Sequence, residues 1–451
     1  MRSSGEPVSP RDLAAALIDA ARKEGADEAD ALVVSSRDVG VSVRDGALEE
    51  AEGAESLDFG VRVLVGRRQA CVSASDPDAA AELAARVVAM ARAAPEDPYA
   101  RLAPADRLAD PAAAPALELE DAAAPPSPDA LREEALRAEA AARAVPGVSQ
   151  VESAGAGWRR SEIAFAATNG FAGGYGRTGR SLSVSAVAGE GLGMETDYDF
   201  ASRIWGEDMP EAEEIGERAG RRAAERLNPR KAKTGAFPVL FDQRVAGSLV
   251  GHVMAAINGA AVARGSSWLK DRMGEAALPP GFTLTDDPHR RRGAGSRPFD
   301  GEGMAMAPRA LIEDGVLKGW VLDLATAAQL GAPAPGGARR GVGAPPAPGT
   351  SNLELTEGAK SRDELIREMG EGLVVTSLIG SSISSTTGSY SRGASGFWVE
   401  RGEIAYPVNE LTIAGSLPDF MKRLTAANDA DRTKSLIVPS LLVEGLTVAS
   451  G

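Results

Sequence analysis

Cysteine and histidine are scarce in this sequence. It contains one cysteine, Cys71, and two histidines, His252 and His289, among 451 residues. A single cysteine excludes an internal disulfide bond. Zinc catalysis normally uses about three protein ligands from His, Cys, Asp or Glu together with a nearby base, and a serine triad needs a histidine. Both kinds of enzyme therefore have few residues here from which to build a site.

Long apolar runs are missing as well. No stretch is apolar for the roughly 20 residues that a membrane-spanning helix needs, and no compact apolar signal region precedes the first helix-like segment. Acidic residues outnumber basic ones, 64 to 49, so the net charge is −15. Such a surface repels nucleic acid and anionic membranes. We expect a cytoplasmic protein with no nucleic-acid partner and no membrane partner.

The pattern of apolar residues divides the chain into three folded units and a linker. Residues 1–95 read as an N-terminal α/β domain and residues 128–230 as a central α+β domain. Residues 96–127 are rich in Pro and Ala and lack periodicity, which indicates a solvent-exposed linker. Residues 231–451 form a β-rich C-terminal domain. We expect an α+β fold whose N-terminal sheet is flanked by helices and whose C-terminal domain contains a buried helix of small residues.

Local signals add detail to this outline. Hairpins are predicted at Asp45-Gly46 and at Arg401-Gly402, where strand-like segments meet turn residues. Serine and glutamate of the segment 361–364 form a capping box that starts a helix. Residues 332–348 consist mostly of Pro, Gly and Ala, which indicates a flexible loop.

A helix predicted to begin at Asp242 and to continue to Gly265 is the most informative element. Its apolar face consists of Val245, Leu249, Val253 and Ile257. A second stripe at the same spacing contains only small residues, namely Gly247, Gly251, Ala255 and Gly259. Glycine inside a helix costs about 1 kcal/mol relative to alanine, so the stripe predicts a strand or second backbone packed closely against it. Tight packing in an alanine-rich core is the alternative interpretation.

Three longer motifs follow this helix in order. They are TLTDDPHRRRGAGSRPFDGEG over residues 283–303, SSTTGSYSRGASGFWVERGEIAYPVNELTIAG over residues 384–415, and PSLLVEGLTVASG from residue 439 onward. With the Asp242 helix they resemble the TldD/PmbA family, and within it the PmbA (TldE) branch. The resemblance is detailed over residues 235–450 and looser over residues 10–228. Several long motifs at compatible spacing are more specific than any single short pattern.

The resemblance implies a metallopeptidase made of two related subunits. In the TldD subunit a His-Glu-x-x-x-His helix and a later cysteine hold zinc. Here Val250, Gly251 and Ala255 fall at the positions of those helix residues, with Gly259 as an anchor. None of them can bind a metal, and shifting the register to His252 supplies no second ligand. We therefore expect no catalytic residue and no metal or other cofactor in this chain, and zinc in a partner subunit.

The second motif supplies the predicted substrate contacts. Its alternation predicts strands beside glycine-rich backbone, which can accept an extended peptide by edge pairing. By resemblance this region lines the substrate cleft, and the alternative is plain core packing. A nucleophilic role for Ser391 or Ser395 would need a base. The predicted substrate-binding residues are Arg392, Gly393, Ser395, Phe397 and Trp398.

The function implied by the resemblance is that of a non-catalytic subunit. The expected partner is a TldD-like, metal-bearing subunit in a heterodimer, with a homodimer of this chain as a further possibility. The expected substrates are unfolded peptides, including precursor peptides that lose a leader and small labile proteins. Two alternatives stay open: a self-associating binding protein without a proteolytic role, and a peptidase that uses its own serine or carboxylate.

Overall fold

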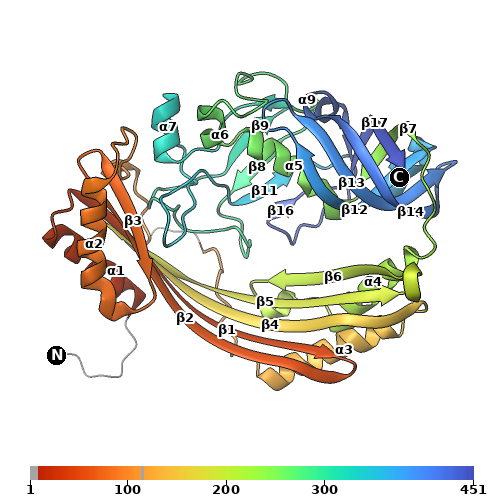
Figure 1. Cartoon of the computed structure of the whole chain (residues 1–451), viewed down its shortest axis with the longest axis horizontal. Coiled ribbons are helices and arrows are strands. Elements are labelled where there is room, and N and C mark those ends of the chain that lie inside the picture. The colour runs from red at the N-terminus through yellow and green to blue at the C-terminus, as the bar shows by residue number, and fades with distance from the viewer. Residues whose placement is uncertain (1–8, 113–115, 451) are drawn as a thin grey trace.

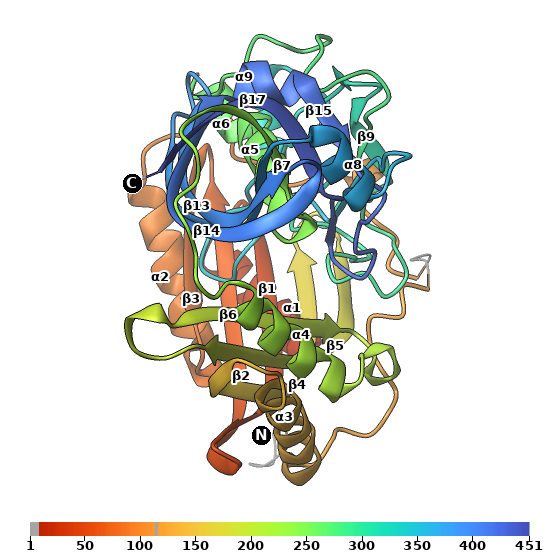
Figure 2. The same cartoon turned by 90° about the vertical axis from the view of Figure 1, so that its right-hand side faces the viewer.

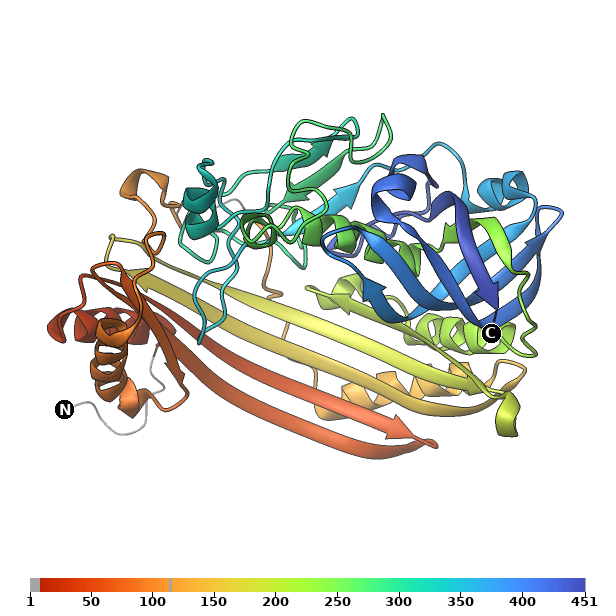
Figure 3. The ribbon, with the colours of Figure 1, turned by 45° about the horizontal axis from the view of Figure 1, so that its top comes forward.

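The computed structural model describes residues 9–112 and 116–450. Its N-terminal half is built on one antiparallel sheet with strand order β3-β2-β1-β4-β5-β6. Figures 1 and 3 show this sheet as a long curved layer with the C-terminal part of the chain on its concave side. The strands are β1 (Glu28–Arg44), β2 (Ala47–Val65), β3 (Arg68–Ala74), β4 (Val148–Ala167), β5 (Ala172–Ala188) and β6 (Glu195–Arg203).

The segments predicted as separate N-terminal and central domains share this sheet. Strand β1 pairs along its length with β4, so that Ala31 lies opposite Ala166 and Val41 opposite Ala156. The hairpin predicted at Asp45-Gly46 is confirmed, because both residues have positive φ angles of 55° and 74° and join β1 to β2. The domain boundaries themselves stay a prediction.

Four helices cover the convex face of the sheet in two pairs (Figures 1 and 2). Alternate residues of β1 point to that face, where Ala31 and Val33 pack under one pair and Val41 and Val43 under the other. The first pair is α1 (Pro10–Lys23) and α2 (Ala80–Ala93), and the second is α3 (Pro128–Arg143) and α4 (Ala212–Glu225).

Helices α3 and α4 approach each other very closely. A Cβ atom added to Gly216 would lie 2.0 Å from the carbonyl oxygen of Ala138, and one added to Gly220 would lie 2.8 Å from that of Ala142. Only glycine allows the α4 backbone to sit at this distance. The close contact of small residues that the sequence suggested elsewhere occurs here.

The predicted linker, residues 96–127, is only partly exposed to solvent. Leu117 and Leu119 are each 6% exposed. The Thr178 N–H donates to the carbonyl of Leu119 at 2.9 Å, and the Trp205 indole donates to the carbonyl of Glu118 at 2.9 Å. The prediction of a solvent-exposed linker is wrong for this stretch. Two buried leucines and hydrogen bonds from the distant residues Thr178 and Trp205 hold it against the sheet.

The loop over residues 332–348 is also packed rather than free. Ala338 is fully buried, and a Cβ atom on Gly60 would lie 1.7 Å from the Val342 carbonyl oxygen. Arg340 forms a buried ion pair with Asp30, and the guanidinium of Arg62 donates to the same carboxylate at 2.8 Å. The prediction of a flexible loop is wrong, because this ion pair ties the C-terminal domain to the N-terminal sheet.

The C-terminal domain contains a sheet that closes on itself. Its order is β14-β13-β12-β7-β17-β15, and an additional pairing joins β14 to β17. The hairpin at Arg401-Gly402 is confirmed by positive φ angles of 55° and 79°. The strands are β7 (Gly235–Phe241), β12 (Gly372–Ile383), β13 (Ser389–Glu400), β14 (Glu403–Ser416), β15 (Leu424–Ala426) and β17 (Leu441–Ser450).

A smaller five-stranded sheet and short helices complete this domain. The capping box at Ser361 and Glu364 is confirmed, since each side chain accepts the other residue's backbone N–H. The smaller sheet consists of β8 (Leu284–Asp287), β9 (Arg309–Glu313), β10 (Val316–Leu317), β11 (Asn352–Leu355) and β16 (Leu436–Ile437), and the helices are α5 (Gln243–Ala256), α6 (Gly259–Ala263), α7 (Leu324–Leu330), α8 (Arg362–Met369) and α9 (Leu417–Phe420).

The predicted α+β fold class is confirmed. Within the described residues, 9–112 and 116–450, no helix is long and apolar enough to cross a membrane.

Candidate functional site

Helix α5 begins where the sequence predicts but ends earlier. The Asp242 side chain caps it by accepting the Arg244 N–H at 3.1 Å. The helix stops at Ala256, and Asn258 caps the separate helix α6. The prediction of one helix to residue 265 is therefore wrong. The break arises because the chain pairs with a distant segment here: the Gly259 N–H donates to the Val321 carbonyl at 2.8 Å.

The small-residue stripe of α5 is not packed along its whole length. Gly259 packs closely, since an added Cβ would lie 2.5 Å from Leu322 and 2.9 Å from the Val321 oxygen. Gly251 and Ala255 are exposed, and an added Cβ on Gly251 would meet no atom within 4 Å. The prediction of close backbone packing is wrong at these two positions, because the helix turns its apolar face inward and leaves Gly251 and Ala255 on the outer side.

The residues at the metal-ligand positions of the TldD pattern carry no donor atoms. Val250 is 2% exposed and packs in the C-terminal core, while Gly251 and Ala255 offer only backbone. Over residues 9–112 and 116–450, no three His, Cys, Asp or Glu side chains gather in a way that could hold a metal ion. A zinc ion does not fit at this place in the chain.

Two of the predicted substrate contacts are buried. Trp398 is 0% exposed and meets Phe237 edge to face with ring centroids 4.9 Å apart. Ser395 is 5% exposed and accepts a hydrogen bond from Arg226 at 3.0 Å. The prediction of substrate contact is wrong for both, because Trp398 points into the core of the C-terminal domain and the Ser395 hydroxyl is covered by Arg226.

The edge-pairing role predicted for this segment is also wrong. Strand β13 is a central strand with β12 on one side and β14 on the other. Gly393 pairs with Ile379 and with Thr412, so its backbone groups already have neighbouring strands. Phe397 is partly buried and packs against Leu240 and neighbouring residues of the β12–β14 face. An extended peptide cannot add itself to β13.

Arg392 keeps a position in which it can meet a ligand. It is half-buried, and its Nε donates to the Gly380 carbonyl at 2.8 Å. Alternation along β13 places it on the same face as Tyr390, toward α5. The Tyr390 ring lies edge to face with His252 of α5 at a centroid distance of 5.7 Å.

Burial and a positive charge set the protonation of this cluster. Burial, with a further contribution from the charge of Arg392, lowers the pKa of His252 below its ordinary value of 6.5. Burial raises the pKa of Tyr390 to about 12. At neutral pH the cluster therefore holds a neutral imidazole, a neutral phenol and one guanidinium. Ser391 points to the opposite face of β13, so it does not pair with this histidine.

Models of known protein families match three stretches of this chain. Profiles of the PmbA/TldA metallopeptidase match residues 29–91 as domain 1, 121–227 as the central domain and 234–450 as the C-terminal domain. Metalloprotease PmbA of Escherichia coli O157:H7 is 36% identical over 427 residues, which cover 94% of this chain and 92% of that protein. The chain belongs to the PmbA/TldD family.

Further relatives place the chain on the PmbA (TldE) branch. The Metalloprotease PmbA homolog of Haemophilus influenzae is 32% identical over 440 residues, 96% of this chain and 94% of that protein. A crystal structure from Bacteroides thetaiotaomicron is 27% identical with a TM-score of 0.90 and covers 98% of both chains. TldE of Thermococcus kodakarensis, 22% identical over 97% of this chain and 100% of its own, has the same fold with a TM-score of 0.85.

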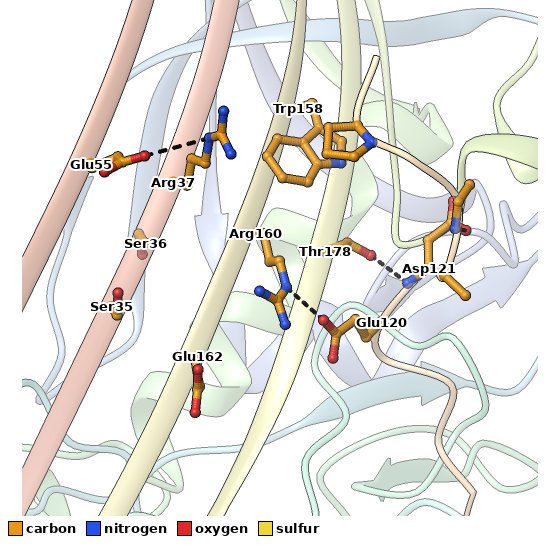
Figure 4. A pocket seen from close by; sticks show the side chains of 13 residues that line it. Ser35, Ser36, Arg37, Glu55, Glu120, Asp121, Trp158, Arg160, Glu162 and Thr178 are labelled. Atoms are coloured by element: carbon orange, nitrogen blue, oxygen red, sulfur yellow. Dashed lines mark hydrogen bonds and ion pairs between the residues drawn. The ribbon is translucent and has the colours of Figure 1, made fainter. Parts of the chain in front are cut away.

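A groove on the convex face of this PmbA-branch chain was not foreseen from the sequence. Its volume is about 720 Å³. Figure 4 shows Trp158 and Arg160 beside the segment that carries Glu120 and Asp121. The charges of the groove are largely matched within the chain: Arg160 meets Glu120 at 2.6 Å, and Arg37 meets Glu55 at 3.6 Å. The groove lies on the opposite face of the sheet from α5, since Arg244 of α5 stacks over Tyr198 on the concave face at 5.3 Å.

Two arginines of the loop after His289 form ion pairs with carboxylates. Arg291 and Arg292 both bind Glu118, and Arg292 also binds Asp208 at 3.0 Å. These hydrogen bonds raise the pKa of Arg292. The neutralising carboxylates come from distant segments rather than from the adjacent acidic residues, which is a long-range contact that a single sequence does not reveal.

Two groups of functional interest were missed. Asp30 is a charged residue within an apolar strand, and that mismatch was the available signal for its buried ion pairs. Tyr390 is the one aromatic residue in a run of serine and glycine, and it could have been singled out beside Arg392. Its pairing with His252 crosses about 140 positions of sequence and has no local signal.

Proposed function

We propose that this chain is the non-catalytic subunit of a PmbA/TldD-type metallopeptidase that acts on unfolded peptides. The observation that carries the proposal is the α5 position itself, where Val250, Gly251 and Ala255 replace the residues that would hold zinc and act as base. A TldD-like partner supplies the metal, and this chain supplies part of the surface around the substrate. The complex works in the cytoplasm on precursor peptides and small labile proteins.

The exposed side of α5 supports the geometric role. Gly251 has no side chain and Ala255 has only a methyl group. An extended peptide can therefore come close to the helix backbone at these two residues. Arg392 lies on the face of β13 toward α5, and its charge acts on His252 of that helix. Trp398, buried in the core, has no part in it.

Self-association is the second candidate, and the free edge of the N-terminal sheet favours it. Strand β6 pairs only with β5, and four apolar side chains on or beside it are exposed. An exposed edge with aromatic residues is suited to pairing with another chain. The four residues are Leu192, Met194, Tyr198 and Phe200, with exposed fractions of 110%, 49%, 54% and 55%.

Mixing the chain with a TldD-like subunit tests the proposal. We expect no cleavage of an unfolded peptide by this chain alone, and cleavage by the mixture that a chelator abolishes, because only the partner carries zinc. Elemental analysis should find far less than one equivalent of zinc in the dialysed chain. A fluorogenic unfolded peptide gives the rate.

Two results would contradict the proposal. Activity of the partner alone, equal to that of the mixture, would show that this chain does not complete the site. Cleavage by this chain alone in the presence of a chelator would favour a serine or carboxylate peptidase instead. A chain that oligomerises but never changes the partner's rate would favour the self-associating protein.

A further inference from the structure

Arg392 differs from other half-buried arginines in what its terminal nitrogens bind. Most buried or half-buried arginines, such as Arg62, Arg180 and Arg244, lie within 4.0 Å of a carboxylate. Some others, such as Arg177, Arg290 and Arg297, lack a carboxylate within 4.0 Å, but their terminal nitrogens donate to backbone carbonyls. Arg392 has no carboxylate partner anywhere in residues 9–112 and 116–450, and its one protein hydrogen bond is to a carbonyl. With 64 acidic residues available, this arginine is left without a counter-ion.

The hydrogen bond of Arg392 fixes the orientation of its guanidinium and does not use the two terminal nitrogens. Nε donates to the carbonyl of Gly380, a glycine with a φ angle of 65°. The two terminal nitrogens are left free. Their planar fork matches the two oxygens of a carboxylate, which a guanidinium binds through two parallel hydrogen bonds.

Two further polar atoms beside Arg392 lack partners. The hydroxyl of Tyr390, a residue only 1% exposed, has no hydrogen-bond partner, and neither has Nε2 of His252. Buried polar groups nearly always have partners, so an unpaired group calls for a ligand or water at that place. Here two such groups and an unpaired guanidinium lie within one cluster.

The cluster borders an open surface. His252 lies next to Gly251 in sequence and one helical turn before Ala255, and both of these residues are exposed. No protein atom lies within 4 Å of the place that a Gly251 side chain would take. An extended peptide can therefore lie along α5 with its carboxylate at Arg392.

We propose that Arg392, with Tyr390 and His252 behind it, is a binding site for a carboxylate of the peptide substrate. The guanidinium binds the two carboxylate oxygens, and the neutral imidazole and phenol form the polar wall of the site. The carboxylate belongs to the C-terminus of the peptide or to an Asp or Glu side chain. That the ligand is a peptide rests on the proposed function, whereas the carboxylate site does not.

The purified full-length chain allows a direct test by NMR titration of its two histidines. His252→Gln assigns the signals, because it leaves only His289. The probes are tetra-alanine with a free C-terminus, tetra-alanine amide, and an N-acetylated, C-amidated peptide with one internal aspartate. We expect at least one carboxylate-bearing probe to shift the His252 signals and to raise the pKa of His252, and the neutral amide to bind about tenfold more weakly or worse.

Variants separate the site from general charge effects. Arg392→Gln should raise the pKa of His252 in the free protein and remove the preference for carboxylate over amide. Arg221→Gln, at an exposed arginine of α4, is the matched control and should change neither. Tyr390→Phe should fold, since it removes an unpaired hydroxyl, and should weaken carboxylate binding.

The outcomes are distinct. Binding of the free-acid peptide assigns the C-terminus as the ligand, and binding of the aspartate peptide assigns a side chain. Equal binding of acid and amide, or a response that survives Arg392→Gln, overturns the site. If His252 responds to carboxylates but no TldD-like partner yields cleavage, the site stands and the proposed function falls.

Discussion

Replacing Asp30 by alanine is expected to destabilise the protein by about 3–5 kcal/mol, because it leaves buried positive charge without a partner. Asp30 is fully buried, and its two partners Arg62 and Arg340 have side chains 4% and 1% exposed. Arg340 comes from the C-terminal domain, so the loss also loosens that domain from the sheet. Urea unfolding at pH 7 gives the free energy of unfolding.

The control for Asp30→Ala lies on the same strand. Asp38 forms an ion pair with Arg159 at 3.0 Å, with side chains 40% and 62% exposed. Such surface pairs contribute at most about 1 kcal/mol, so Asp38→Ala should unfold nearly like the wild type. Equal effects of the two variants would contradict a stabilising role of the buried Asp30–Arg340 ion pair between the two domains.

The same region gives stability a defined pH dependence. Burial would raise the pKa of Asp30, but the charges of Arg340 and Arg62 outweigh it and lower the pKa below 3.8. Its stabilisation is therefore present above pH 3.8 and is lost as the pH falls through the lower folded value. Asp30→Ala should remove this loss in acid, which urea midpoints measured across pH would show.

Glu302 acts in the opposite direction. Burial, with the charges of Asp300 and Asp323, raises its pKa well above 4.5. The folded state thus favours the protonated form, so stability from this group decreases as the pH rises from 4.5 through the raised value.

Gly216→Ala is expected to lower the free energy of unfolding by about 1–3 kcal/mol, since the new methyl group overpacks the α3–α4 contact. The atom it would meet is the Ala138 carbonyl oxygen, 2.0 Å away. That oxygen belongs to helix backbone, which cannot move aside alone. Thermal and urea unfolding measure the change.

Gly251→Ala is the matched control for this substitution. It makes the same chemical change inside a helix, but the new methyl group meets no atom within 4 Å. Helix propensity then adds about 0.5–1 kcal/mol of stability. The two variants should differ in sign. A loss at Gly251 would mean that the open side of α5 is covered in solution, for example by a second copy of the chain.

Local rules account for the elements that were predicted well. The Asp242 cap, the Ser361 capping box and the turn at Asp45-Gly46 depend on side chains and φ angles within a few residues, so the sequence contains the whole cause. The α+β fold class likewise depends on periodicity along single segments. Motif resemblance supplied the family, which neither periodicity nor spacing could have done.

The errors concern contacts between distant residues. Whether a stripe of glycines meets a neighbour depends on which helix lies opposite: Gly216 faces Ala138, while Gly251 faces solvent. The motif alone predicted that Trp398 contacts substrate. Its position on β13 instead places the side chain in the core. The break after Ile257 depends on Val321, more than 60 positions away, and no local signal marks it.

The closure of the C-terminal sheet has a consequence for the timing of synthesis. Strand β7 lies between β12 and β17, and its Phe241 pairs with Leu441. At roughly 5–20 residues per second, a ribosome adds β17 on the order of ten seconds or more after β7. The strands of the N-terminal sheet end at Arg203, so they can pair while translation continues, although Arg340, the partner of Asp30, is added later. Until β12 and β17 are added, the apolar edges of β7 are unpaired. During that interval a chaperone or the N-terminal half of the chain must shield them from aggregation.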